Sequence, residues 1–398
     1  MKAPLHQGPL TPLRSGYTTG ACAAAAAKGA ALMLVHQMTV REVTIELPAG
    51  ISATFQLSGQ NYSLNSASCF VVKDAGDDPD VTNGAEVHAA IFRDREPDAE
   101  NSRIVIAGGK GIGKVTKPGL ATAPGEWAIN PVPRKMIEEA VACSVFATAD
   151  SRMRNTDSFQ VTISIPDGEE RAKKTLNTRL GIIGGLSILG TTGIVRPISA
   201  KAWTDTIDAA LDVAKACGCS TVVFSTGRTS ELAAQKYLNR KNVTPPPLAL
   251  FDSPSPPPEP SGTLPEFTEE AFIMMGDHIA YALQACQLRE FRQPIIACQF
   301  AKLLKIACGH ENTHAAASEL DIEQLLAWGQ AGGLSDLTLA SISNANTARE
   351  IAITSSFDPA LLNLVFQHAR SAVAKHAPDI STQFLVADYS GNCIFDSR

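Results

Sequence analysis

The first apolar stretch of the chain, residues 20–35, is rich in alanine and follows the polar pair Thr18 and Thr19. Alanine has the strongest helix propensity of all residues, and a threonine side chain can cap a helix N-terminus. The pattern therefore predicts a helix that begins near Thr18 and ends near His36. Its small side chains allow other segments of backbone to approach closely.

Short runs of alternating or β-branched residues follow this helix, separated by Gly, Asn and Asp. They predict strands at residues 40–47, 52–57, 69–73 and 103–107. A hairpin of two further strands, 159–166 and 171–176, is predicted around the turn residues Asp167 and Gly168. We therefore expect residues 1–176 to form an α+β domain.

From residue 199 onward, helical and strand-like patterns alternate. The expected order is helix 204–216, strand 221–225, helix 230–238, strand 271–275, helix 277–288, strand 294–299 and helix 301–308. Such alternation is typical of a mainly parallel sheet with helices on both faces. We therefore expect residues 177–398 to form a Rossmann-like α/β domain, with its ligand edge at the carboxyl ends of the strands. Within it, residues 244–265 hold 9 of the chain's 24 prolines and predict a disordered loop.

Composition excludes several classes of function. The 398 residues include 40 acids and 34 bases, and a net charge of −6 argues against a nucleic-acid-binding protein. No window approaches the roughly 20 uninterrupted apolar residues of a membrane-spanning helix, and residues 21–35 make a poor export signal. The nine cysteines are scattered and suggest neither a disulfide framework nor a zinc site. We expect a cytoplasmic protein without a membrane partner.

Two basic islands stand out against this acidic balance. Residues 103–135 contain six bases and one acid, with glycines at 108, 109, 111 and 113, which gives a local charge of +5. Residues 171–201 contain six bases, no acid and a second run of glycines, for a local charge of +6. Bare backbone N–H groups beside ammonium and guanidinium groups favour anion binding. The alternatives are a turn with solvated lysines for the first island and a tight structural crossover for the second.

Two motif matches point to other chemistry but lack its context. Residues 108–114 match the GxxxxGK pattern of a phosphate-binding loop, but Val115 stands where a Ser or Thr must hold magnesium. His310 to His314 match HExxH, a zinc-peptidase motif that requires a helix. Gly309 suggests that the preceding helix ends just before this motif. An ATP site and a zinc site are therefore both disfavoured.

Four aspartates crowd the loop after the strand predicted at residues 69–73. Asp74, Asp77, Asp78 and Asp80 are close enough for their charges to raise one another's pKa. One of them would then suit a general base, or the cluster would hold a cation. A plain polar turn fits the pattern equally well.

Six motifs, taken together, resemble one family. They are residues 13–28 (LRSGYTTGACAAAAAK), 71–82 (VVKDAGDDPDVT), 108–114 (GGKGIGK), 128–134 (AINPVPR), 181–197 (GIIGGLSILGTTGIVRP) and 224–228 (FSTGR). In this order the chain resembles the cobalt-precorrin-5B C(1)-methyltransferase family of anaerobic cobalamin biosynthesis. The resemblance implies transfer of a methyl group from S-adenosylmethionine to ring carbon C1 of cobalt-precorrin-5B, which gives cobalt-precorrin-6A. Cobalt would be part of the corrinoid substrate, and no metal site in the protein is expected.

This chemistry suggests a division of roles among the motifs. The corrinoid and its carboxylates would contact Thr18, Thr19, Lys73, Lys110, Lys114, Lys117 and Arg134. The methyl donor would contact Gly181, Gly184, Gly185, Ser187, Gly190, Thr191 and Thr192. Asp74, Asp77 or Asp78 would accept the proton that the macrocycle loses. The alternative is a non-catalytic tetrapyrrole- or anion-binding protein, and homo-oligomer formation stays open.

Overall fold

The computed structural model describes residues 13–94, 103–146, 157–239, 267–315, 317–318 and 320–398. The chain divides into two compact units, Met1–Ser199 and Ala200–Arg398. The first unit thus extends beyond the boundary expected after residue 176 and includes the glycine-rich residues 181–193. The proline-rich loop predicted at 244–265 lies outside the described residues.

The first unit is built around α1 (Thr19–His36). As predicted, Thr18 caps this helix, because its side-chain oxygen accepts a hydrogen bond from the N–H of Ala21 (3.2 Å). Among the described residues, α1 is the one helix that passes a test of length and apolar character for crossing a membrane. However, 83% of its residues are buried inside the structure, as in the core helix of a folded domain.

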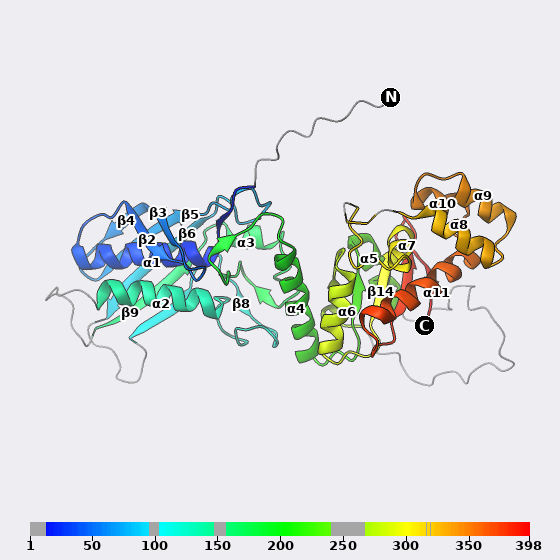
Figure 1. The fold of residues 1–398 in the computed structure, drawn as a ribbon. Helices are drawn as coiled ribbons and strands as arrows, with labels where there is room; N and C mark the ends of the chain where they lie inside the picture. Colours follow the sequence, from blue (N-terminus) through cyan, green and yellow to red (C-terminus); the bar gives the residue numbers. More distant parts are fainter. Residues whose placement is uncertain (1–12, 95–102, 147–156, 240–266, 316, 319) are drawn as a thin grey trace, which may run out of the picture. The chain divides into compact units, whose positions relative to one another are not determined.

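α1 and α2 (Pro131–Val145) lie side by side and pack on a five-stranded sheet (Figure 1). The strand order is β4-β5-β6-β9-β7, antiparallel except for the parallel pair of β7 and β9. The strands are β4 (Ser58–Tyr62), β5 (Ser66–Val72), β6 (Glu86–Asp94), β7 (Ile104–Gly108) and β9 (Ser158–Ser164). Alternate residues, such as Val87, Ala89 and Ile91, are buried in one core with α1. The α+β organisation predicted for this part of the chain is present.

Three short ribbons complete the first unit. They pair β2 (Glu42–Glu46) with β3 (Ser52–Gln56), β1 (Gly16–Tyr17) with β11 (Ile194–Val195), and β8 (Lys114–Val115) with β10 (Ile182–Ile183). The last two ribbons join residues 182–195 to strands from early in the chain. This pairing explains why the unit extends to Ser199.

The predicted hairpin at residues 159–176 is wrong. Its first strand exists as β9, but the second is replaced by α3 (Gly168–Ala172) and turns. Both edges of β9 are occupied, by β6 and β7, so no edge remains for a hairpin partner. Gly168 instead packs on Gly111, where a Cβ would lie 2.2 Å from the Gly111 carbonyl oxygen.

The second unit contains the mainly parallel sheet that the sequence predicts. Its strand order is β13-β12-β14-β15-β16, with β16 as the antiparallel member. The strands are β12 (Val223–Ser225), β13 (Phe272–Met274), β14 (Ile295–Gln299), β15 (Gln383–Ala387) and β16 (Cys393–Asp396). Ile295 and Ala297 pack in the core that includes α5 (Arg228–Leu238). Ile296 and Cys298 point to the opposite face, into the larger core that includes α6 (Ile279–Leu288) and α7 (Phe300–Ala307). Both faces of the sheet are therefore covered.

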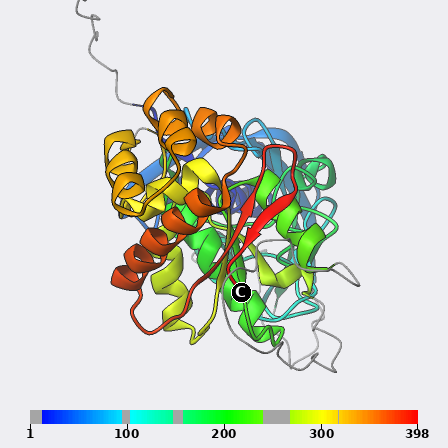
Figure 2. The same cartoon turned by 90° about the vertical axis from the view of Figure 1, so that its right-hand side faces the viewer.

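Helices alternate with these strands close to the predicted positions. They are α4 (Ala200–Ala216), α5 (Arg228–Leu238), α6 (Ile279–Leu288) and α7 (Phe300–Ala307), with a short 3₁₀ helix η1 (Glu269–Ala271) before β13. Between β14 and β15 the chain adds four helices that the pattern does not predict: α8 (Ile322–Ala331), α9 (Asp336–Ser343), α10 (Ala348–Thr354) and α11 (Pro359–His376). Figure 2 shows α8 to α10, in orange, grouped together beside α11.

Candidate functional site

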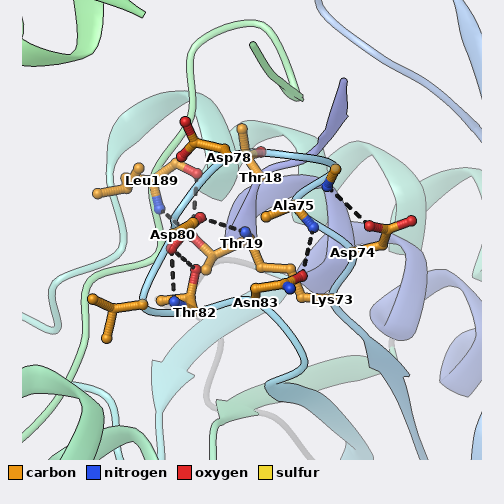
Figure 3. Close-up of polar contacts among 12 residues, drawn as sticks. Thr18, Thr19, Lys73, Asp74, Ala75, Asp78, Asp80, Thr82, Asn83 and Leu189 are labelled. Atoms are coloured by element: carbon orange, nitrogen blue, oxygen red, sulfur yellow. Dashed lines mark hydrogen bonds and ion pairs between the residues drawn. The ribbon is translucent and has the colours of Figure 1, made fainter. Parts of the chain in front are cut away.

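The loop that carries the predicted catalytic aspartates lies beside the N-terminus of α1 (Figure 3). The N–H of Tyr17 donates a hydrogen bond to the carbonyl of Asp74 (2.8 Å), and Ser15 forms a β-bridge with Gly76. A Cβ on Gly16 would lie 2.1 Å from the carbonyl carbon of Ala75, so only glycine permits this approach. Two of the motifs that carry the family resemblance therefore meet here.

Asp74 is held by a two-point ion pair with Arg14. The guanidinium Nη1 and Nη2 lie 2.5 and 2.9 Å from the two carboxylate oxygens. The side-chain hydrogen bond from Arg14 lowers the pKa of Asp74, and the N–H of Gly76 adds to this effect. The expectation that neighbouring aspartates raise its pKa is therefore wrong for Asp74, because the ion pair with Arg14 lowers it.

Asp80 forms the second ion pair of this loop, with Lys73. The ammonium nitrogen lies 2.5 Å from Oδ2 of Asp80, and the lysine side chain is almost completely buried. Burial alone would raise the pKa of Asp80, but hydrogen bonds from Lys73 and Thr82 outweigh it, so the pKa is lowered. Lys73, which we expected to contact the substrate, thus has its charge balanced inside the fold.

The two remaining aspartates hold backbone groups from other segments. Oδ2 of Asp77 accepts a hydrogen bond from the N–H of Arg14 (2.6 Å). Oδ1 of Asp78 accepts one from the N–H of Ile198 (2.9 Å), near the end of the first unit. The loop therefore ties both ends of the first unit's described chain to the start of α1.

The two glycine-rich segments pack directly on each other. The N–H of Leu186 donates to the carbonyl of Gly111, and the N–H of Gly113 donates to the carbonyl of Leu186 (both 2.9 Å). A Cβ on Gly185 would lie 2.3 Å from backbone atoms of Gly111. Gly111 and Gly185 are therefore needed for the close backbone packing between the two basic islands.

The second glycine-rich segment also supports the start of α1. The N–H of Gly20 donates to the carbonyl of Leu189, and the N–H of Leu189 donates to the hydroxyl of Thr19 (both 3.0 Å). A Cβ on Gly190 would lie 2.4 Å from Thr18. Thr18 and Thr19, predicted to contact the substrate, are both buried in this junction.

The residues predicted to contact the methyl donor divide into two groups. Packing accounts for Gly185 and Gly190, and a Cβ on Gly181 would lie 2.5 Å from the side chain of Lys117. Ser187 is buried. The others are more open: a Cβ on Gly184 would meet no atom within 4 Å, and Thr191 and Thr192 are exposed.

The predicted carboxylate-binding cations differ in their availability. Lys110 and Lys114 are exposed, and the Lys114 ammonium lies 4.6 Å from the ring centroid of Trp127. Lys117 and Arg134 are half-buried and donate hydrogen bonds to the carbonyls of Arg179 (3.2 Å) and Ile106 (3.3 Å). The structure therefore brings Lys110 and Lys114 to the surface and fixes the other two.

The HExxH match does not form a metal site. Residues 310–314 are not helical, so the two histidines are not one helical turn apart. In the part of the chain that the structure describes, no group of three or more His, Cys, Asp or Glu side chains is placed to hold a metal ion. Thr313, inside the motif, is instead fully buried, and its hydroxyl donates to Oδ1 of Asp277 (2.7 Å).

Sequence reasoning gave Arg14 no role, and it considered Asp80 only as part of the aspartate cluster, not as the partner of Lys73. Both lie inside quoted motifs, Arg14 in residues 13–28 and Asp80 in residues 71–82. The sequence feature that could have singled out both residues is their position inside these motifs. The pair of Arg14 with Asp74 joins residues 60 positions apart, and the pair of Lys73 with Asp80 depends on how the loop turns back on itself, so both become evident only in the folded chain.

Two family models match the chain, one described as "CbiD" at residues 7–197 and one described as "CbiD, C-terminal domain" at residues 312–398. A protein of Pelobacter propionicus named cobalt-precorrin-5B C(1)-methyltransferase is 60% identical over 395 residues, which is 97% of each chain. Proteins of the same name from Geotalea daltonii and Geobacter metallireducens are both 52% identical and match 96% of this chain and 98% of their own. A crystal structure of a cobalamin biosynthesis protein (cbiD) from Archaeoglobus fulgidus is 29% identical, with a TM-score of 0.37 over 75% of this chain and 81% of that one.

Proposed function

The chain belongs to the CbiD family, and we propose that it methylates ring carbon C1 of cobalt-precorrin-5B with S-adenosylmethionine as the methyl donor. One observation carries this proposal: proteins named for that activity are 52 to 60% identical to the chain over at least 96% of its length. The similarity spans both units, so it includes the parts that bind and react as well as those that only support the fold. We also propose a cytoplasmic location, which the burial of α1 in the core supports.

The corrinoid is a broad macrocycle edged with carboxylates, and the first unit offers cations for them. Exposed Lys110 and Lys114 pair with carboxylates at the rim of the macrocycle. Trp127, beside Lys114, adds an aromatic surface. Lys117 and Arg134 contribute positive charge from half-buried positions.

The methyl transfer itself requires positioning more than a reactive side chain. An electron pair at C1 forms the new bond to the methyl carbon while the bond from that carbon to sulfur breaks. The sulfonium becomes a neutral thioether, and the macrocycle loses a proton. Because the two reactants must be aligned at close distance, orientation by the protein supplies much of the rate enhancement.

A carboxylate near the N-terminus of α1 accepts this proton. We assign the role to Asp77 or Asp78 rather than to Asp74, because Arg14 pairs with both oxygens of Asp74 and lowers its pKa. A lower pKa makes a carboxylate a weaker base. In Asp77 and Asp78 the hydrogen bonds come from backbone N–H groups.

Residues 181–193 are less well suited to bind the methyl donor than their glycine content suggested. Packing already requires Gly181, Gly185 and Gly190, which leaves Gly184, Thr191 and Thr192 for a ligand. The second unit offers a better supported position. We propose that this unit is Rossmann-like, because four parallel strands carry helices on both faces and follow the order 2-1-3-4, numbered as they occur in the unit.

A turnover experiment tests the proposed function. Purified protein is incubated with cobalt-precorrin-5B and S-adenosylmethionine that carries an isotopically labelled methyl group. We expect labelled methyl at C1 of the corrinoid product and one S-adenosylhomocysteine for each product formed. A reaction without corrinoid is the control for donor breakdown. Tight corrinoid binding without any methyl transfer would favour the non-catalytic tetrapyrrole-binding alternative.

A further inference from the structure

The sheet of the second unit has a point where the direction of its connections reverses. From β12 the chain continues to β13 on one side, and from β14 it continues to β15 on the other side. α5 packs on one face of these strands and α7 on the opposite face. In open α/β sheets, ligands bind outside the carboxyl ends of the strands at such a reversal. In this chain Thr226 and Gly227, after β12, and Gln299, at the end of β14, occupy that position.

The turn after β12 is held in place by buried polar side chains. Ser225, Ser230 and Glu231 are at most 2% exposed. Oε2 of Glu231 lies 2.5 Å from the Arg228 guanidinium, and the hydroxyl of Ser230 donates to the carbonyl of Gly227 (2.9 Å). Burying polar groups costs free energy unless they are paired, so this arrangement keeps residues 226–228 in one conformation.

Neither the backbone conformation nor the packing of the turn after β12 requires a glycine at position 227. Its φ of 178° is extended backbone, which any residue adopts, and a Cβ built on it would meet no atom within 4 Å. In contrast, Gly185 and Gly190 are required by close contacts inside the first unit. A bare backbone that neither conformation nor packing requires leaves room for a ligand to approach.

A second polar loop lies at the same edge of the sheet. The N–H groups of Met275 and Gly276 donate to the carbonyl of Ser225 (3.0 and 3.3 Å), so the loops after β12 and β13 are in contact. Asp277, the next residue, forms an ion pair with Lys302 of α7 and accepts a hydrogen bond from Thr313. Three connections that are far apart in the sequence therefore place polar groups at this edge.

The chemistry of this edge differs from that of the first unit. Arg228 is paired with Glu231, and Lys302 is paired with Asp277, so these charges are balanced within the protein. These two ion pairs therefore offer little attraction for a polycarboxylate. Hydroxyl, amide and backbone groups suit a ligand with ribose hydroxyls, ring nitrogens and an amino-acid end.

We infer that the nucleoside part of the methyl donor binds at this edge, against Gly227 and between Thr226 and Gln299. This inference rests on the proposed function, which supplies the donor. It places the donor on the second unit and reserves the exposed lysines of the first unit for the corrinoid.

Calorimetric titration of the full chain with S-adenosylhomocysteine, the product of the donor, tests the inference. In Gly227→Val the added Cβ meets no protein atom within 4 Å, and the side chain enters the proposed ligand position. We expect its affinity to fall by at least about tenfold, with an unchanged melting temperature. Gly184→Ala in the first unit, where a Cβ also meets no protein atom, tests the rival donor position in residues 181–193. The control is Gly218→Ala, between α4 and β12, where a Cβ likewise meets no protein atom, and we expect it to bind like the wild type.

The outcomes separate the inference from the proposed function. If the wild type does not bind S-adenosylhomocysteine, the donor assignment in the proposed function fails. If the wild type binds and Gly227→Val binds equally well, or if Gly184→Ala alone loses affinity, the inference is overturned while the function stands. Should Gly227→Val lower the melting temperature, hydrogen exchange of the wild type decides. Slower exchange at residues 226–231 with ligand supports the site, and unchanged exchange there rejects it.

Discussion

Lys73 and Asp80 form an ion pair whose two members differ in their access to water. Their charged atoms are 2.5 Å apart, but the lysine side chain is 1% exposed and the aspartate side chain 23% exposed. The ammonium therefore depends on Asp80 for its counter-charge, whereas water can reach the carboxylate. Replacing Asp80 alone and replacing Lys73 alone should therefore lower the free energy of unfolding by different amounts.

We predict that Asp80→Asn destabilises the protein by about 3 kcal/mol, because it leaves a buried ammonium without its counter-charge. Lys73→Met should cost less, about 1 to 2 kcal/mol, since water can hydrate the carboxylate that remains. Urea-induced unfolding of the full chain measures both values. Lys173→Met is the control, because it breaks an exposed pair with Glu170 and should cost less than about 1 kcal/mol. Equal losses for the two buried-pair variants would contradict the asymmetry.

The same pair predicts how stability depends on pH. Burial by itself would raise the pKa of Asp80, but hydrogen bonds from Lys73 and Thr82 lower it overall. A carboxylate with a lowered folded-state pKa contributes stability that is fully present above its unfolded pKa of about 4 and is lost as the pH falls through the folded value. Unfolding free energies at neutral pH and below about pH 4 should show a larger acid loss in the wild type than in Asp80→Asn. A loss of the same size in both proteins would assign the acid sensitivity to other groups.

Local patterns predict much of the fold. α1 and the helices and strands of the second unit up to α7 follow from runs of alanine and from alternating apolar segments, because those signals depend on neighbouring residues. The hairpin after β9 fails as a prediction because the occupation of both edges of β9 is a long-range property. Likewise, the contact of Gly111 with Gly185 is invisible in sequence, so glycines that serve packing resemble glycines that serve a ligand.

That contact gives a prediction about the glycine-rich segments. Gly185→Ala should destabilise the first unit by more than about 2 kcal/mol, because the new Cβ would lie 2.3 Å from the backbone of Gly111 and the two glycine-rich segments would have to separate. Gly184→Ala meets no atom and adds only the strain of a left-handed residue (φ 86), about 1 kcal/mol. Thermal and urea unfolding of the two variants make the comparison. If Gly185→Ala is the more stable variant, the packing role of Gly185 is wrong.

Corrinoid binding should depend on Lys114. Its ammonium is exposed beside Trp127, so Lys114→Gln removes a charge without opening a cavity. We expect a loss of about three- to tenfold in affinity for a corrinoid polycarboxylate, and the loss should shrink at high salt because the interaction is exposed. S-adenosylhomocysteine affinity should not change. Titration of both ligands against the variant is the measurement, and equal weakening of both would reject separate sites for the corrinoid and the donor.

Ile198 combines an unfavourable backbone conformation with little burial, and this combination predicts a stabilising substitution. Its φ is 55° and its side chain is 77% exposed, while its N–H is held by Asp78. A β-branched residue is strained in the left-handed region, whereas asparagine tolerates it. Ile198→Asn should therefore raise the unfolding free energy by about 0.5 to 1 kcal/mol. Ile198→Val is the control: it keeps the β-branch and should leave stability nearly unchanged. Urea unfolding measures all three proteins, and an Ile198→Asn protein no more stable than the wild type would show that the conformation at this position carries no such strain.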